Sequence, residues 1–384
     1  MDLSLSDETL GVQRLVRQLV ERYAMPLEAK FLRGETITDE ERDEMTAAAK
    51  EQGLWGLDLP EEYGGAALST IDNVVITEEN SRCLITIPFG GRAGFLLNSN
   101  DEQKEKYLMP TLRGEKRSFF AQTEPSGGSD PGNRMETTAV RDGDNWVING
   151  SKIFITGAGE ADFGVVIAVT DKEKRQHGGV TAFLVDKDTP GFNIIRQIPV
   201  MRAAHNDGFV GPWELQFDDC VVPHSQVLGE VGMGFRLAQH GLTGARMNIG
   251  AQATGIAARC YDMMHNYSKE RVLFGEPLAA KQAIQGMLVD SYIDIHTTRL
   301  VVFDAAAKND KGEDVRVEAG LVKLLGSEMV ARVVDRAIQV HGGYGVTTEL
   351  PLAHWYNRIR AMRVYEGPTE VQKYQVVARA LLHQ

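Results

Sequence analysis

The strongest constraint on the fold is a change in sequence pattern at two points along this chain of 384 residues. Apolar side chains recur at helical spacing in residues 1–116 and 230–384, whereas residues 117–229 contain short runs rich in β-branched and aromatic residues. Pairs that contain glycine interrupt these runs at 142–143, 149–150, 178–179 and 190–191. The sequence therefore predicts an α+β chain of three domains: an N-terminal helical domain (1–116), a central antiparallel β sandwich or barrel (117–229) and a C-terminal helical bundle (230–384).

Local signals predict the individual elements. Ser6 is expected to cap a helix that ends at Pro26, and Thr38 and Ser69 to cap two further helices. Another short helix is expected at 101–112. The expected strands are 118–120, 137–140, 146–148, 153–156, 165–169, 180–185, 192–195 and 213–217. The expected C-terminal helices are 237–268, 279–308, 314–340 and 371–382. Such long helices favour a bundle that shares faces with other subunits.

Composition narrows the class of protein. The net charge of −12 argues against nucleic acid or an acidic membrane surface as the main partner. Three widely spaced cysteines, Cys83, Cys220 and Cys260, are expected to be reduced thiols rather than a disulfide framework or a zinc site. The N-terminus has no signal-peptide pattern, and no apolar run approaches the roughly 20 residues that span a bilayer. We therefore expect a soluble, cytoplasmic protein without membrane insertion.

Two glycine-containing segments of the predicted β domain can bind a polar ligand. Thr-Glu-Pro-Ser-Gly-Gly-Ser-Asp-Pro-Gly at 123–132 follows a strand, and its backbone N–H groups and hydroxyls suit a phosphate or a polar heterocycle. An ordinary polar turn is the alternative. The segment is not a Gly-x-Gly-x-x-Gly followed by a helix, so a Rossmann site is disfavoured. Phe154 and Thr156 end another strand, where plain strand packing is the alternative.

The C-terminal region holds the arginines and glycines of interest. Arg271 and Phe274 could contact a pyrophosphate and a base, or Arg271 could be a solvated cation at a helix end. Arg246 lies in a small and apolar stretch and needs an anionic partner, either protein or ligand. The run 339–345 holds three glycines in four positions, which favours the close approach of a large ligand, with a tight turn as the alternative. His341 has no second ligand at metal spacing, and we expect no metal site.

Glu366 is the candidate catalytic base. It lies between Tyr365 and Gly367 in a mostly apolar run, where burial is expected to raise its pKa and the glycine lets a ligand approach the backbone. A carboxylate of this kind suits removal of a weakly acidic carbon-bound proton. The alternative is an acidic residue at a helix start within a turn.

Taken together, these segments resemble the acyl-CoA dehydrogenase flavoprotein family in order and spacing. The shared segments are Thr-Glu-Pro-Ser-Gly-Gly-Ser-Asp (123–130), Phe-Ile-Thr-Gly (154–157), Phe-Asp-Asp-Cys-Val-Val-Pro (217–223), Arg-Val-Leu-Phe-Gly (271–275), Gln-Val-His-Gly-Gly-Tyr-Gly (339–345) and Tyr-Glu-Gly (365–367). The resemblance covers nearly the whole chain. It implies the same order of domains, bound FAD and a homotetramer.

The resemblance also implies roles for single residues. Gln122, Thr123 and Ser129 would contact the flavin or its pyrophosphate, and Phe154 and Thr156 would face the isoalloxazine ring. The adenine and pyrophosphate end would be held, partly across a subunit interface, by Arg271, Phe274, Gln339, Gly342 and Gly343. Ser129, Arg246, Tyr365 and Gly367 would contact the acyl-CoA, with Arg246 near its nucleotide. Glu366 would take the α-proton while the β-hydrogen leaves as hydride to flavin N5.

Several positions depart from the pattern of the family. Gln122 replaces an aliphatic residue, Ser126-Gly127 replaces Gly-Ala, and Phe154 replaces a commoner tryptophan. Thr243 takes the place of a frequent acidic residue, and Pro368 removes an N–H and a hydroxyl. The segment 203–212 is also atypical. Chain length and branching of the acyl group are therefore left open.

The implied function is FAD-dependent dehydrogenation of an acyl-CoA to the trans-2-enoyl-CoA, as in fatty-acid β-oxidation, with electron-transfer flavoprotein as acceptor. An acyl-CoA oxidase that uses O₂, or a flavin oxidase that acts on a nitrogen compound, is the alternative within the same fold. Glu366 argues against the nitrogen oxidase, whose relatives tend to have Asp or no acid there. A flavin-binding but inactive interaction protein is the third possibility.

Overall fold

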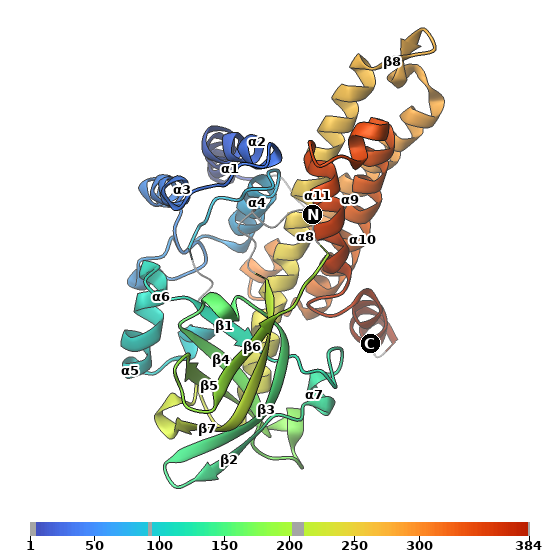
Figure 1. The fold of residues 1–384 in the computed structure, drawn as a ribbon. Helices are drawn as coiled ribbons and strands as arrows, with labels where there is room; N and C mark the ends of the chain where they lie inside the picture. Colours follow the sequence, from blue (N-terminus) through green and yellow to red (C-terminus); the bar gives the residue numbers. More distant parts are fainter. Residues whose placement is uncertain (1–4, 91–93, 202–210, 383–384) are drawn as a thin grey trace.

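A computed structural model describes residues 5–90, 94–201 and 211–382. Most of the atypical segment 203–212 lies outside these residues. Figure 1 shows the N-terminal helices beside the long C-terminal helices, with the central sheet at one end of both. This is the helix–sheet–helix order that the sequence predicts, and the predicted fold class is confirmed.

A helix begins at each of the predicted caps Ser6, Thr38 and Ser69, and the described residues of the N-terminal region form six α-helices in all. They are α1 (Asp7–Leu19), α2 (Met25–Leu32), α3 (Asp39–Glu51), α4 (Thr70–Asn80), α5 (Asp101–Gln103) and α6 (Met109–Arg113). Ser6 Oγ accepts a hydrogen bond from the Thr9 N–H at 3.1 Å, and Thr38 forms a complete capping box with Glu41. Ser69 caps α4 in the same way.

The prediction that the first helix ends at Pro26 is wrong. A π-helical turn (Val20–Ala24) connects α1 directly to α2, and Pro26 lies in the first turn of α2. The proline is tolerated there because the π turn changes the hydrogen-bond register just before it, so its missing N–H group falls at the junction of the two helices.

Seven strands of the described residues form one sheet with the order β1-β4-β2-β3-β7-β6, and β5 pairs with β4. They are β1 (Ser118–Ala121), β2 (Thr138–Asp142), β3 (Asn145–Thr156), β4 (Phe163–Val169), β5 (Val180–Asp186), β6 (Phe192–Gln197) and β7 (Pro212–Pro223). Most pairs are antiparallel as expected, but β4 pairs in parallel with β1 and with β2. Every residue of β4 is buried, which is typical of a strand with parallel neighbours.

Two expected strands, 146–148 and 153–156, are one strand, so Asn149-Gly150 is not a turn. Gly150 has φ +144° at a shift in register between β3 and β7, where a Cβ would lie only 2.6 Å from Thr137 Cα. The glycine therefore marks a β-bulge rather than a hairpin. A second register shift follows between Lys152 and Ile155.

The C-terminal region is a bundle of long helices. Its helices are α8 (Gly234–Glu270), α9 (Gln282–Asp310), α10 (Arg316–His341), α11 (Pro351–Arg360) and α12 (Ala378–Leu382). Helix α11 was not among the predicted helices. A small hairpin of β8 (Val272–Leu273) and β9 (Glu276–Pro277) joins α8 to α9. Within the described residues, no helix combines the length and the hydropathy needed to cross a membrane.

Glycines bring the central helices into close contact. A Cβ on Gly326 of α10 would lie 2.9 Å from the Cα of Gly250 of α8, so only glycine allows this approach. Further along the same pair of helices, the rings of Tyr267 and His341 stack at 4.5 Å. These two contacts show that α8 and α10 run in the same direction. At 1.5 Å per residue the 37 residues of α8 span roughly 55 Å, from the sheet to the β8–β9 hairpin (Figure 1).

Candidate functional site

The glycine-rich loop follows β1 directly and stands on a buried ion pair. Gln122 is almost fully buried and its Nε2 has no hydrogen-bond partner, whereas Thr123 is half-buried and Ser129 is exposed. Beneath them, Lys152 Nζ donates to the Gln122 carbonyl at 3.0 Å and to Glu124 Oε1 at 2.8 Å. The loop is therefore fixed at its start and open to solvent at its glycine end.

Phe154 is exposed because of the second bulge in β3. It has φ +59°, and 56% of its surface is accessible. Thr156, two residues further on, is also exposed. A regular strand would alternate the two faces, but the bulge turns this ring outward near the end of the strand.

Glu366 lies in a turn whose carbonyls are held by three side chains. Arg246 Nε of α8 and Gln372 Nε2 donate to the Glu366 carbonyl at 3.2 and 2.9 Å. Lys323 Nζ of α10 donates to the Gly367 carbonyl at 2.6 Å. Burial lowers the pKa of Arg246, and the negative charge of Glu366 opposes that shift. The predicted substrate residue Arg246 thus contacts the backbone of the predicted base.

The neighbours of Glu366 differ in exposure. Tyr365 is 41% exposed, whereas Glu366 and Gly367 are half-buried. Gly367 has φ +88°, and a Cβ there would overlap Gln372 Nε2. The glycine is therefore required by the turn itself, in addition to any contact with a ligand.

A second group of predicted residues lies at the far end of α8. Arg271 follows the last residue of that helix and is exposed. Phe274 and Gly275 form the two-residue turn of the β8–β9 hairpin with φ +55° and +83°, and Phe274 is 95% exposed. Positive φ at both positions is typical of a type I′ turn. The hairpin thus presents an aromatic ring to solvent.

The glycine run at the end of α10 belongs to this distal end. Gln339, Gly342 and Gly343 are exposed, and a Cβ on either glycine would meet no atom within 4 Å. Gly342 has φ +59° and ψ −132°, which only glycine adopts readily. The stacking of His341 on Tyr267 ties the run to the end of α8 that carries Arg271.

Within a single chain, the predicted cofactor residues therefore lie in two separate groups. The first group comprises Gln122, Thr123, Ser129, Phe154 and Thr156 on the sheet; the second comprises Arg271, Phe274, Gln339, Gly342 and Gly343 at the distal end of the bundle. Along α8, Arg246 and Arg271 are 25 residues apart, roughly 38 Å at the helical rise. Within the single chain, the two groups therefore lie near opposite ends of α8 (Figure 1).

Backbone strain coincides with the predicted site. Within the described residues, six that are not glycine have positive φ: Ala67, Phe154, Arg175, Asp219, Phe274 and Glu366. Three of these six are residues that the sequence analysis assigned to the site. A left-handed conformation costs a non-glycine residue about 1–2 kcal/mol, and such strain clusters at functional sites.

Four buried polar residues that support the glycine-rich loop or the turn of Glu366 were not predicted from the sequence. They are Glu124, Lys152, Lys323 and Gln372, each at most 5% exposed. Lys323 could have been noticed because it is the single charge in the apolar run 321–325. Lys152 could also have been noticed, because it continues the alternation in which Trp146 and Ile148 of β3 face inward. Gln372 carries no such signal, because it lies among other polar residues such as Glu370 and Lys373.

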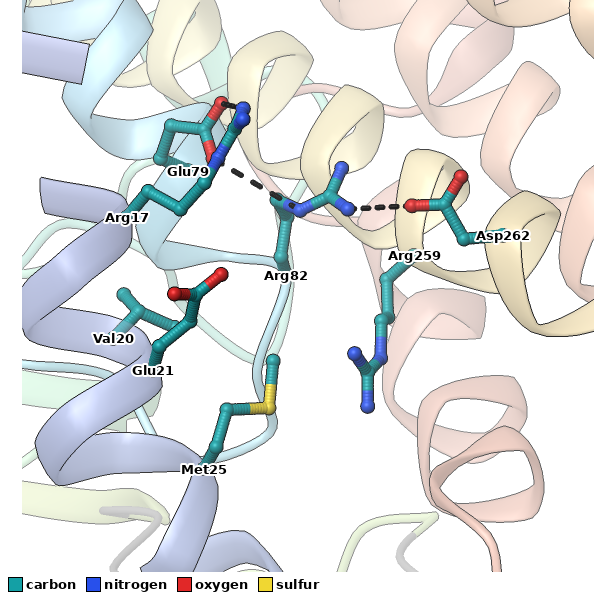
Figure 2. Close-up of a pocket in the computed structure, with 8 residues that line it drawn as sticks. All are labelled: Arg17, Val20, Glu21, Met25, Glu79, Arg82, Arg259 and Asp262. Atoms are coloured by element: carbon teal, nitrogen blue, oxygen red, sulfur yellow. Dashed lines mark hydrogen bonds and ion pairs between the residues drawn. The ribbon is translucent and has the colours of Figure 1, made fainter. Parts of the chain in front are cut away.

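A pocket of about 530 Å³ lies elsewhere, between α1, α4 and α8 (Figure 2). Its charged side chains neutralise one another: Arg17 contacts Glu79 at 2.7 Å, and Arg82 contacts Asp262 at 2.6 Å. None of its lining residues is a predicted site residue. We interpret the pocket as a polar seam between the N-terminal helices and α8.

The residues of the two groups fit FAD. A flavin ring needs an apolar face and hydrogen-bond donors, which the exposed ring of Phe154, the unpartnered amide of Gln122 and the Thr156 hydroxyl can supply. A pyrophosphate needs a cation and unobstructed backbone, and the distal group offers Arg271 and the open glycines 342–343.

Comparisons with known proteins cover nearly the whole chain. Three family descriptions match: acyl-CoA dehydrogenase N-terminal domain at 6–115, middle domain at 119–220 and C-terminal domain at 232–382. The chain is 35% identical to (R)-benzylsuccinyl-CoA dehydrogenase of Thauera aromatica, covering 99% of this chain and 97% of that protein. It is also 35% identical to the short-chain specific acyl-CoA dehydrogenase of Clostridium acetobutylicum, covering 97% and 98%.

Solved structures share the fold. Butyryl-CoA dehydrogenase from Megasphaera elsdenii superposes with a TM-score of 0.87 at 33% identity, over the full length of both chains. The structure of PigA with FAD and proline superposes with a TM-score of 0.86 at 26% identity, also over both full lengths. From its motifs, its three matching domains and these relatives, the chain belongs to the acyl-CoA dehydrogenase family and is an FAD-dependent oxidoreductase.

Proposed function

We propose that the protein removes the α and β hydrogens of an acyl-CoA thioester to give the trans-2-enoyl-CoA, with Glu366 as the base. The observation that carries this proposal is the turn of Glu366, a strained residue whose carbonyl is held from α8 and from the segment that follows it. Such rigid placement suits a base that must meet one C–H bond.

The residues of the chain have separate tasks in this reaction. The Glu366 carboxylate accepts the α-proton, and its own backbone N–H stabilises the negative charge that develops on the thioester oxygen. Tyr365 and Gly367 line the path of the acyl group, with Ser129 at its edge. Exclusion of water strengthens these interactions. FAD, when bound, supplies the redox chemistry by accepting the β-hydrogen with its electron pair.

We propose that the cofactor is held by two subunits at once. One subunit would contribute Gln122, Thr123, Ser129, Phe154 and Thr156, and its neighbour would contribute Arg271, Phe274, Gln339, Gly342 and Gly343. The exposed apolar side chains of α9, Val289, Tyr292 and Ile293, support an assembly that buries them. A homotetramer with domains 1–116, 117–229 and 230–384 is the arrangement we favour.

The electron acceptor that we propose is electron-transfer flavoprotein, in a cytoplasmic fatty-acid β-oxidation step. The alternative within the same fold is an oxidase that passes the electrons to O₂. Glu366 favours an acyl-CoA over a nitrogen compound as substrate, because the α-proton of a thioester needs a carboxylate base.

An anaerobic absorbance screen tests this proposal. The purified protein is mixed with saturated acyl-CoAs of graded length and with branched ones, and bleaching of the flavin is followed. At least one acyl-CoA should bleach it within seconds, and readmitted O₂ should restore colour slowly if the protein is a dehydrogenase. Failure of every acyl-CoA to bleach a fully loaded protein would refute the proposed activity.

A further inference from the structure

We propose that Lys323 and Gln372 are positioning residues that clamp the Glu366–Gly367 turn and thereby aim the catalytic carboxylate. This inference rests on the proposed role of Glu366 as the base. Neither residue belongs to a sequence motif of the site, and the two approach the turn from separate segments, α10 and the π-helical turns Val371–Val377.

The clamp acts on two consecutive carbonyl groups. Gln372 Nε2 donates to the Glu366 carbonyl at 2.9 Å, and Lys323 Nζ donates to the Gly367 carbonyl at 2.6 Å. Both side chains have no exposed surface. Because both donors are buried, water does not replace them. Loss of Lys323 would leave the Gly367 carbonyl only a long contact of 3.4 Å with Gln372 Nε2, and loss of Gln372 would leave the Glu366 carbonyl only the bond of 3.2 Å from Arg246.

The turn needs such donors because its backbone is strained. Glu366 has φ +54° and Gly367 has φ +88°, so two left-handed residues follow one another. Relief of the strain at Glu366 needs rotation about its N–Cα bond, which would swing its carboxylate away together with the carbonyl groups of Glu366 and Gly367. The two bonds oppose that rotation, since it would turn both carbonyl oxygens away from their donors.

A buried ammonium is an expensive way to hold a carbonyl, which argues for a specific role. Burial, and then the charge of Arg246, lower the pKa of Lys323 to about 8, while Glu366, Glu328 and Glu370 oppose that shift. Near neutral pH the side chain therefore keeps its charge.

The test measures proton abstraction without hydride transfer. A 3-thia-acyl-CoA has sulfur at the β position, so the base can exchange its α-hydrogens with D₂O but no β-hydride can leave. Exchange is followed by NMR in the FAD-loaded parent protein and in Lys323→Met, Gln372→Leu, Glu366→Gln and the control Lys308→Met. Lys308 is a partly exposed lysine of α9 that pairs with Asp304 and Glu318 at 3.0 Å.

Each clamp variant should exchange on the order of 10- to 100-fold more slowly at saturating analogue, because a small misplacement of a catalytic group has an effect of this size. Analogue affinity and FAD content should stay within about 3-fold, since neither depends on the aim of a carboxylate. The control should match the parent. The anaerobic rate of flavin bleaching by an acyl-CoA substrate should fall in parallel.

Exchange at the parental rate in a folded clamp variant overturns the assignment for that residue. If Lys323→Met does not fold, Gln372→Leu decides whether the clamp exists. Loss of exchange only together with loss of FAD or of analogue binding would mean a general structural role, and would also overturn the proposal. Unchanged exchange in Glu366→Gln would instead show that the base lies elsewhere, a failure of the proposed function itself.

Discussion

The ammonium of Lys152 lies 2.8 Å from Glu124 Oε1, and neither side chain is more than 4% exposed. Glu124 also accepts the backbone N–H groups of Glu136 and Thr137. Burial alone would raise the pKa of Glu124, but the charge of Lys152 and these hydrogen bonds outweigh it, so its pKa lies below the ordinary value. This pair joins the start of the glycine-rich loop to β3, the strand that carries Phe154.

Lys152→Met should lower the free energy of unfolding by about 3–5 kcal/mol, because it leaves Glu124 buried and charged without its partner. Urea unfolding of the apoprotein measures the loss. The exposed Lys187→Met serves as control. The double variant Lys152→Met/Glu124→Gln should lose less than the sum of the two single variants, since the unpaired charge is gone. Strict additivity would show that the pair is not coupled.

Glu366→Gln should abolish flavin bleaching by a good acyl-CoA substrate on the time scale of seconds. The amide keeps the size of the side chain but cannot accept the α-proton, and loss of a positioned base reduces rates on the order of 10²–10⁴-fold or more. Stopped-flow absorbance under anaerobic conditions measures the rate. Ligand affinity and FAD content should change little. Bleaching at the parental rate would contradict the assignment of the base.

Arg271→Ala should weaken FAD binding by about 1.5–3 kcal/mol if the guanidinium makes a charge-assisted bond to the pyrophosphate. Flavin release on dilution, followed by fluorescence, measures the affinity. Arg316→Ala is a matched control, because that arginine is exposed and pairs only locally with Asp314. Equal retention of flavin in both variants would make Arg271 a simple surface cation.

The protein should sediment as an assembly larger than its chain mass of 42.3 kDa. Phe274→Asp should weaken both the assembly and FAD retention, because it puts a carboxylate in place of a ring that is 95% exposed in the single chain and that the proposed shared site would cover. Sedimentation velocity with absorbance at the flavin band measures both properties. A fully active monomer of the parent protein would contradict the shared cofactor site.

Lys323 should make stability depend on alkaline pH. Its pKa of about 8 lies below the ordinary value of 10.5, so between these values the unfolded chain binds a proton that the folded chain has released. The free energy of unfolding of the parent, relative to that of Lys323→Met, should therefore rise between pH 7 and about 10. The total gain should approach about 3 kcal/mol, and it should be lost when the pH is lowered back through 8. Denaturant unfolding of both proteins across this range measures the difference. A difference that is constant with pH would show that the pKa of Lys323 is not lowered.

The sequence by itself determined the large divisions and the motifs. Helical and strand periods of 3.6 and 2 residues can be recognised from neighbouring side chains alone, so they predicted most of the helices, most of the strands and the α+β order. Caps such as Ser6 and Thr38 were predictable for the same reason, because their partners lie three residues away. The predictions at Pro26 and Asn149-Gly150 failed where a π turn and a bulge let the element continue.

Only the tertiary structure decided how the proposed base is held and how the predicted cofactor residues are divided. Arg246 and Lys323 reach the turn of Glu366 from 120 and 44 residues away, distances at which no local pattern links donor and acceptor. The length of α8 separates Phe154 from Phe274, although both occur in family motifs. The hold on Glu366 and the separation of the two groups both depend on the positions of the ends of long helices. These positions are fixed by packing between segments far apart in the sequence, such as those of Gly250 and Gly326, rather than by neighbours in the chain.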